Sequence, residues 1–184
     1  MSASDPDAQP GEDRLSWREL GAAEHERVWG RFEGWFHFRP GMEPPDWPGI
    51  REPEPSLTWD ISPAYVLDED FCAKALVDLQ LRTLRALRQC TRPGEELYAI
   101  AWQHACYAVN PHGGPGAEDV SCWPVPVLPD GVYTLFLAPD GRFGIFGHPW
   151  EMTVCVFGRE LLDAYGEDQP WLFRKLVRRD GARG

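Results

Sequence analysis

Residues 129–158 carry the clearest pattern of hydrophobic and polar positions in the chain. Residues 132–138 are apolar on both faces, which is typical of a central strand in a sheet. The turn formers proline, aspartate and glycine follow at 139–141, so that the next apolar residues are expected to return as a hairpin partner. The pattern predicts an antiparallel meander with strands at 132–138, 142–146 and 152–157, followed by a short helix at 159–165.

Two further patterns stand out for their length. Residues 68–90 form an apolar stripe that begins with three acidic residues and ends among arginines, as the dipole of a helix favours. Residues 96–109 alternate between two faces and predict the longest strand. His104 and Trp102 share one face of this strand, and small alanines on the other face would let the long helix pack closely.

Shorter elements surround these. Six prolines within residues 39–55 exclude a helix and a central strand, so this segment is expected to lie extended across the surface. The remaining predictions are a helical turn from Ser16, a helix at 22–32, a strand-like run at 35–38, a strand at 57–61 and an amphipathic helix at 171–179.

These elements predict an α+β fold, with an antiparallel sheet of about four to six strands packed against one long helix, plus short flanking helices. Residues 1–13 are polar, acidic and without periodicity, and we interpret them as a disordered acidic tail. Residues 14–184 are expected to form a single domain, because this length suffices for one core.

Charge and hydropathy limit the classes of binding partner and the cellular location that are expected. The net charge is −11, which argues against nucleic acid, because a phosphate backbone requires a basic surface. No apolar window approaches the length that spans a bilayer, and the N-terminus has no secretory pattern, so a cytoplasmic location without membrane contact is expected. An acidic surface suits a basic protein partner.

Neither cysteines nor histidines form a metal motif. The five cysteines are an odd number without paired spacing, and we interpret them as reduced, buried thiols. The chain has no His-x-His and no His-Glu-x-x-His, so neither a metal site nor a cofactor is predicted. His37, His104, His148 and Glu151 would converge on a metal only through the fold. Cys106 beside His104 is a poor nucleophile pair, because alternate strand residues lie about 6.5–7 Å apart.

The candidate catalytic residues are His104, His148 and Glu151. Glycine before His148 and proline after it make a rigid corner that presents an imidazole and a carboxylate, the groups that general acid–base chemistry uses. A ligand pocket would be completed by the neighbouring Trp102, Gln103 and Trp150. The alternative is that His148 and Glu151 satisfy backbone groups at this corner and that Trp150 plugs the core.

Four segments together resemble a known bacterial family: VWGRF with FHFRP, then REPEPSLTWDIS, then YAIAWQHACY, then WPVPVLPDGVYTLFLAPDGRFGIFGHPWEMTVCVFG. The chain resembles the family labelled domain of unknown function 2716 from about Trp17 to Tyr165. The resemblance implies a bacterial domain. It implies no activity and no catalytic residues, because the family label carries none.

Two functions from different classes follow. The first is an acidic protein-interaction module of the immunity or inhibitor type, supported by the charge, by tryptophans such as Trp47 and Trp123, and by the lack of a catalytic motif. The second is a small-molecule-binding protein or enzyme that uses His148, Glu151 and His104 in one pocket. The sequence leaves open whether the protein is an enzyme, what it binds and its oligomeric state.

Overall fold

The structure is a computed structural model that describes residues 16–66, 68–113 and 120–183. The tail predicted at 1–13 lies outside the described residues. Within these ranges nine strands form one antiparallel sheet in the order β1-β4-β3-β5-β6-β7-β2-β8-β9. The strands are β1 (Ser16–Glu19), β2 (Ser56–Asp60), β3 (Leu97–Ala101), β4 (Tyr107–Asn110), β5 (Thr134–Leu137), β6 (Gly144–His148), β7 (Thr153–Phe157), β8 (Lys175–Arg179) and β9 (Ala182–Arg183).

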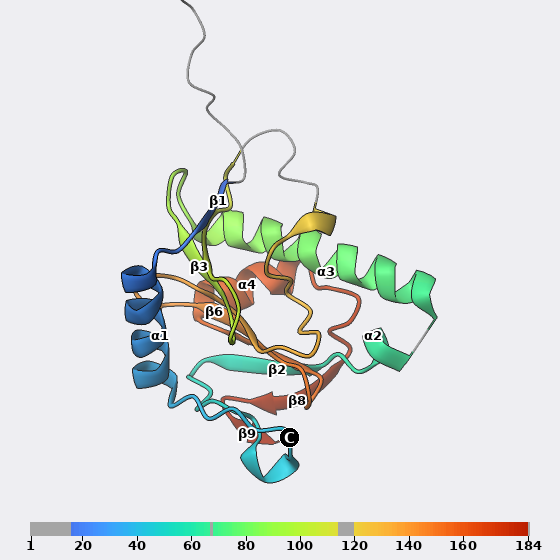
Figure 1. Cartoon of the computed structure of the whole chain (residues 1–184). Helices are drawn as coiled ribbons and strands as arrows, with labels where there is room; N and C mark the ends of the chain where they lie inside the picture. The colour runs from blue at the N-terminus through green and yellow to red at the C-terminus, as the bar shows by residue number, and fades with distance from the viewer. Residues whose placement is uncertain (1–15, 67, 114–119, 184) are drawn as a thin grey trace, which may run out of the picture.

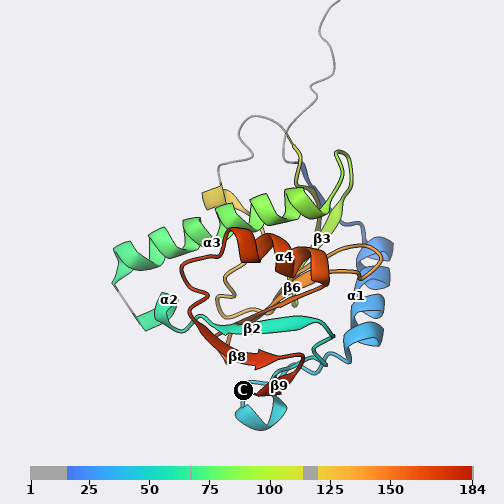
Figure 2. The ribbon, with the colours of Figure 1, turned by 180° about the vertical axis from the view of Figure 1, so that it is seen from behind.

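Helices cover both faces of this sheet (Figures 1 and 2). The α-helices of the described residues are α1 (Ala22–Phe36), α2 (Pro63–Val66), α3 (Glu69–Cys90) and α4 (Arg159–Glu167). One hydrophobic cluster joins α3 and α4 to inward residues such as Phe136 and Val154. The other joins Phe32 and Phe36 of α1 to the alternate residues of the same strands, such as Phe146. The sheet is therefore the middle layer, which explains why its central strands are buried on both faces.

The long helix and the central meander are confirmed. α3 begins after Asp68, whose carboxylate accepts a bond of 2.9 Å from the backbone N–H of Phe71. Strands β5, β6 and β7 pair in sequence as predicted. A side chain at Gly144 of β6 would collide with the ring of Phe157, so only glycine fits at this position.

The predicted fold of four to six strands packed against one long helix is wrong, because the described residues form nine strands with helices on both faces. The predicted strand at 96–109 is two strands, β3 and β4, joined by a turn in which Gln103 has a φ of 63°. Residues 171–179 contain strand β8, which pairs with β2, rather than a helix. Ser16 begins strand β1 rather than a helical turn, and the run at 35–38 begins inside α1.

Residues 37–55, which we call the strap, cross the face of the sheet beside α1. The strap contains a short 3₁₀ turn (Pro44–Asp46) and two cis peptide bonds, Trp47–Pro48 and Glu54–Pro55. Ile50 and Trp47 pack inward, onto the core and onto His148. The strap crosses the surface, as its prolines predicted. It covers part of the sheet and lies over the Gly147–Glu151 corner.

Candidate functional site

The His148 side chain lies at the end of β6, beneath the strap. It is only 1 % exposed, and its ring meets the rings of Tyr133 and Trp47 edge to face, at centroid distances of 4.7 and 5.7 Å. Gly49 of the strap approaches the imidazole so closely that a Cβ there would lie 3.4 Å from its Cδ2 atom. The strap and the sheet therefore hold the imidazole in a fixed position away from solvent.

The bonds of the imidazole define its protonation state. The backbone N–H of Glu151 donates to Nδ1 over 3.0 Å, so that this nitrogen carries no proton. Nε2 faces the Tyr133 hydroxyl at 3.3 Å, and that hydroxyl also bonds both backbone groups of Gly41. Burial lowers the pKa of His148 to about 4. The imidazole is therefore neutral near pH 7 and satisfies the backbone of the corner.

The Glu151 carboxylate is engaged in hydrogen bonds with other side chains of the protein. Arg178 of β8 binds it with two nitrogens, at 2.5 and 2.8 Å, and the hydroxyl of Thr153 donates over 2.9 Å. Burial raises the pKa of Glu151, but the bonds from Arg178 and Thr153 outweigh burial, and the pKa is lowered below its usual value. The carboxylate is thus ionised, and its link to His148 passes through the backbone N–H rather than through its oxygens.

Arg178 also joins the strap to the sheet. Its Nε donates to Glu52 over 2.9 Å, and the Thr58 hydroxyl donates to the same oxygen over 2.8 Å. The side chains of Arg178 and Glu52 are 4 % and 1 % exposed. We call Glu52, Thr58, Glu151, Thr153 and Arg178 the Arg178 cluster. Sequence reasoning missed Arg178 and Glu52, because nothing in the local pattern shows that β8 and the strap meet.

His104 lies elsewhere. It is exposed in the turn between β3 and β4, and it lines a cavity of about 310 Å³ together with Asp130, Val132 and Thr134. Thr134 and Val132 belong to the face of the sheet opposite to that of Tyr133 and His148. The structure therefore does not bring His104 and His148 into one pocket.

The remaining predicted pocket residues divide in the same way. Trp102 and Trp150 lie with their ring centroids 5.8 and 5.0 Å from that of Tyr133, so they belong to the surroundings of His148. Gln103 is exposed in the β3–β4 turn. Sequence reasoning missed Tyr133, the ring that these aromatic residues share. Its position in an apolar strand gives no signal of a polar role.

Neither thiol nor metal chemistry gains support from this geometry. Burial raises the pKa of Cys106, which keeps its thiol protonated. His37 is exposed at the end of α1, in a left-handed conformation with a φ of 50°. Across the residues that the structure describes, His, Cys, Asp and Glu side chains form no group of three that could hold a metal ion.

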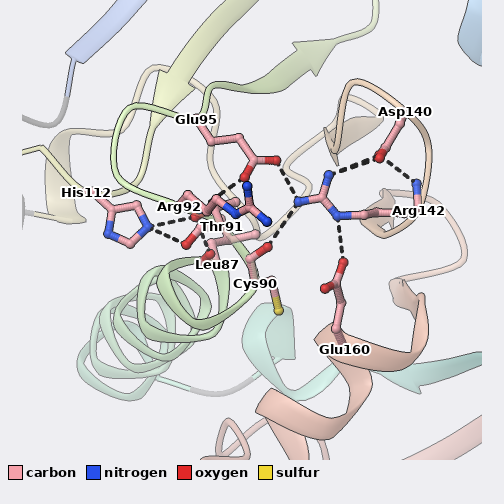
Figure 3. A network of polar contacts seen from close by, with 9 residues as sticks. All are labelled: Leu87, Cys90, Thr91, Arg92, Glu95, His112, Asp140, Arg142 and Glu160. Carbon is pink, nitrogen blue, oxygen red and sulfur yellow. Dashed lines mark hydrogen bonds and ion pairs between the residues drawn. The ribbon is translucent and has the colours of Figure 1, made fainter.

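A second polar cluster surrounds Arg142, after the β5–β6 turn (Figure 3). Its guanidinium binds three carboxylates, those of Glu95, Glu160 and Asp140, at 2.6, 2.8 and 3.2 Å, and also donates to the backbone oxygen of Cys90. These partners come from the last residue of α3, the loop between α3 and β3, the start of α4 and the turn itself. Because the guanidinium is shared among internal partners, this cluster fastens elements rather than presenting a charge to a ligand.

His112 extends the same region. Its Nε2 lies 3.0 Å from the Thr91 hydroxyl and 2.9 Å from the Thr91 backbone oxygen (Figure 3). The Thr91 hydroxyl in turn donates to the backbone oxygen of Leu87. The last carbonyls of a helix have no hydrogen-bond partner within the helix. This histidine therefore caps the C-terminus of α3.

Comparison with known proteins places the chain in a family. The model of the family described as "Protein of unknown function (DUF2716)" matches residues 19–162. The chain is 33 % identical over 162 residues to "Uncharacterized protein YxiI" of Bacillus subtilis (strain 168), a match that covers 87 % of this chain and 98 % of that protein. No solved structure matches.

Among the described helices, none combines the length and the apolar character that crossing a bilayer requires. The matched residues contain the Gly147–Glu151 corner, the meander and α3. They therefore include the centre of the fold, His148 and Glu151, whereas Arg178 lies outside the matched range. The chain belongs to the family described as "Protein of unknown function (DUF2716)".

Proposed function

We propose that this protein is an acidic protein-binding module that holds a basic protein partner, as immunity and inhibitor proteins do against basic toxins. The net charge of −11 supports the sign of the partner. Electrostatic complementarity of this kind speeds encounter and selects partners, even where it adds little to affinity.

The observation that carries this proposal is the surface of the strap and of the neighbouring β8–β9 turn. Four exposed carboxylates lie there, and within the described residues none of them has an ion-pair partner: Glu43, Asp46, Glu54 and Asp180. On the strap itself three exposed carboxylates stand against two exposed guanidinium groups, Arg39 and Arg51, and Arg179 and Arg183 flank Asp180 at the turn. Unpaired carboxylates at an exposed surface cost nothing in stability and remain free for a partner.

The geometry of the Gly147–Glu151 corner weighs against the alternative of an enzyme. His148 is neutral, buried and bonded to the backbone, and Glu151 is bound by Arg178 and Thr153. A general base must reach a substrate proton within hydrogen-bond distance, and the strap covers this imidazole. The corner supports the surface from below and is not offered as a catalytic site.

The experiment is capture of proteins from a lysate of the source organism on the immobilised chain, followed by purification of the captured protein and measurement of its affinity against salt. We expect a basic protein whose affinity falls steeply between about 0.1 M and about 1 M salt, where the Debye length shrinks from ~10 to ~3 Å. Affinity that ignores salt, or capture of acidic proteins alone, would overturn the proposal.

A strap variant tests the location. It carries three isosteric substitutions, Glu43→Gln, Asp46→Asn and Glu54→Gln, and leaves Asp180 in place because its carboxylate accepts the backbone N–H of Ser56. We expect the affinity to fall about tenfold or more, since each rim charge contributes a few tenths to one kcal/mol.

The matched control removes the same three charges elsewhere: Glu26→Gln, Glu69→Gln and Asp70→Asn, all on exposed helix positions. The control has the same net charge as the strap variant. Equal loss of affinity in both variants would show that total charge, rather than the strap, attracts the partner.

A further inference from the structure

The strap and the β8–β9 turn enclose a cleft of about 760 Å³. Its walls include Trp35 at the end of α1, Pro48 and Glu54 of the strap, and Asp180 and Gly181 of the turn. Segments far apart in the sequence thus line this cleft. Figure 1 shows the strap and β9 below α1. We call it the Trp35 cleft.

Trp35 presents an exposed but fixed ring. The side chain is 44 % exposed, among the most exposed of the large hydrophobic residues described. On its covered side the ring touches the β5–β6 turn, where a Cβ on Gly141 would lie 2.9 Å from Cζ3. Gly141 has a φ of 75°, which favours glycine, and the missing side chain lets the indole lie against the turn. The rest of the ring faces the cleft.

The charges of the cleft favour a cation. Arg178 offsets the charge of the lining residue Glu52, which leaves the carboxylates of Glu54 and Asp180 against the guanidinium of Arg51, two negative charges against one positive. Among the described residues, neither Glu54 nor Arg51 forms an ion pair. Asp180 uses Oδ1 to accept the backbone N–H of Ser56 over 2.8 Å, and its second oxygen has no such bond.

Glu52 provides an independent sign of an incomplete site. Its side chain is 1 % exposed, and only Oε1 is bonded, by Arg178 and Thr58. Oε2 is buried, and within the described part of the chain it has no hydrogen-bond partner. Buried polar atoms are nearly always satisfied, so Oε2 of this lining residue marks a place where a polar group of a ligand can bind.

We propose that the Trp35 cleft binds an arginine side chain of the basic partner, an inference that rests on the proposed function and names its binding site. A planar guanidinium stacks on an indole face and presents several N–H donors in one plane. Glu54 and Asp180 line the same cleft as Trp35 and supply carboxylate acceptors for these donors. A lysine ammonium satisfies the carboxylates but lacks the flat face, so arginine is preferred.

The first experiment titrates the isolated protein with Nα-acetyl-arginine amide and follows ¹H–¹⁵N spectra. We expect saturable shifts at the indole N–H of Trp35 and at the amides of residues 49–52, 54 and 180–181. The neutral isostere Nα-acetyl-citrulline amide should shift none of them. Equal shifts with citrulline, or no saturable shift at these residues, would overturn the inference.

Two substitutions locate the binding. Trp35→Ala and Glu54→Gln should each weaken the arginine probe about five- to tenfold, because one removes the stacking face and the other a charge. The matched controls are Trp171→Ala, whose ring is 47 % exposed on another surface, and Glu69→Gln. Both controls should bind the probe as the wild type does. Unchanged binding by the Trp35 and Glu54 variants would contradict the assignment.

The second experiment separates this inference from the proposed function. If the variant with both Trp35→Ala and Glu54→Gln still holds the captured basic partner with wild-type affinity, the cleft inference is wrong and the proposed function stands. If the wild type captures no basic protein but binds the arginine probe at the cleft, the proposed function fails and the guanidinium site remains. Loss of the partner by the double variant alone supports both.

Discussion

Protonation of His148 should destabilise the fold. The ring is buried, Nδ1 already accepts the N–H of Glu151, and a proton on Nδ1 would face that donor. Burial lowers the pKa of His148 from 6.5 to about 4 in the folded state. Between about pH 6.5 and about pH 4, His148 therefore binds a proton in the unfolded chain but not in the folded chain. The free energy of unfolding falls as the pH falls through this range.

The magnitude follows from the two pKa values. Each unit between them is worth about 1.4 kcal/mol, so the full loss between pH 6.5 and 4 is about 3 kcal/mol. Between about pH 7 and about pH 5 the expected loss is about 2 kcal/mol. Below about pH 4 the folded state accepts the proton as well, and this contribution levels off.

The assay is urea unfolding at several pH values, followed by tryptophan fluorescence, for the wild type and His148→Asn. The asparagine oxygen can accept the Glu151 N–H as Nδ1 does, but it does not titrate. The unfolding free energy of the wild type minus that of the variant should therefore fall by about 2 kcal/mol from pH 7 to pH 5. A difference that stays constant over this range would refute the account of a buried, neutral His148.

Three further substitutions test the packing around the site, all by urea unfolding. Arg178→Met should cost about 3–5 kcal/mol, because it leaves buried carboxylates unpaired, and adding Glu151→Gln should recover part of the loss; full additivity would contradict the ion pair. Gly144→Ala should cost about 1–3 kcal/mol, because its Cβ would lie 2.5 Å from a ring carbon of Phe157, whereas Gly30→Ala in α1 meets nothing and should be neutral or stabilising. Arg142→Met should cost about 1–3 kcal/mol through its shared carboxylates, and a change below ~0.5 kcal/mol would show that they are solvent-screened.

Local patterns predicted the elements whose signals are local. The acidic start and basic end of α3, with Asp68 as its cap, lie within the helix itself. The β5–β6–β7 meander is set by apolar runs and by a turn with proline, aspartate and glycine. Both were therefore available to sequence reasoning.

Strands at the sheet edges were missed because their partners are distant in sequence. β8 has an apolar and basic spacing that also fits a helix, and only its pairing with β2 and the bonds of Arg178 decide between the two. β1 is a strand because it pairs with β4, more than 85 residues away along the chain. The turn between β3 and β4 has neither glycine nor proline, so the two strands looked like one.

The same limits applied to the candidate site. Alternation on a single strand put His104 on the face of Trp102, but the turn at Gln103 moves it to the other side of the sheet from His148. The corner at His148 and Glu151 was visible as a rigid turn, whereas its true partners, Tyr133 and Arg178, come from other strands. The interpretation in which the corner satisfies backbone groups agrees with the bond from the Glu151 N–H to His148.

The most direct test of a basic partner held at the Trp35 cleft is its affinity for three proteins at about 0.1 M salt: the wild type, the Trp35→Ala, Glu54→Gln double variant, and the matched Trp171→Ala, Glu69→Gln variant. We expect the first and third to bind equally and the second to bind at least about tenfold more weakly. Equal affinity of all three proteins would contradict the cleft as the binding site.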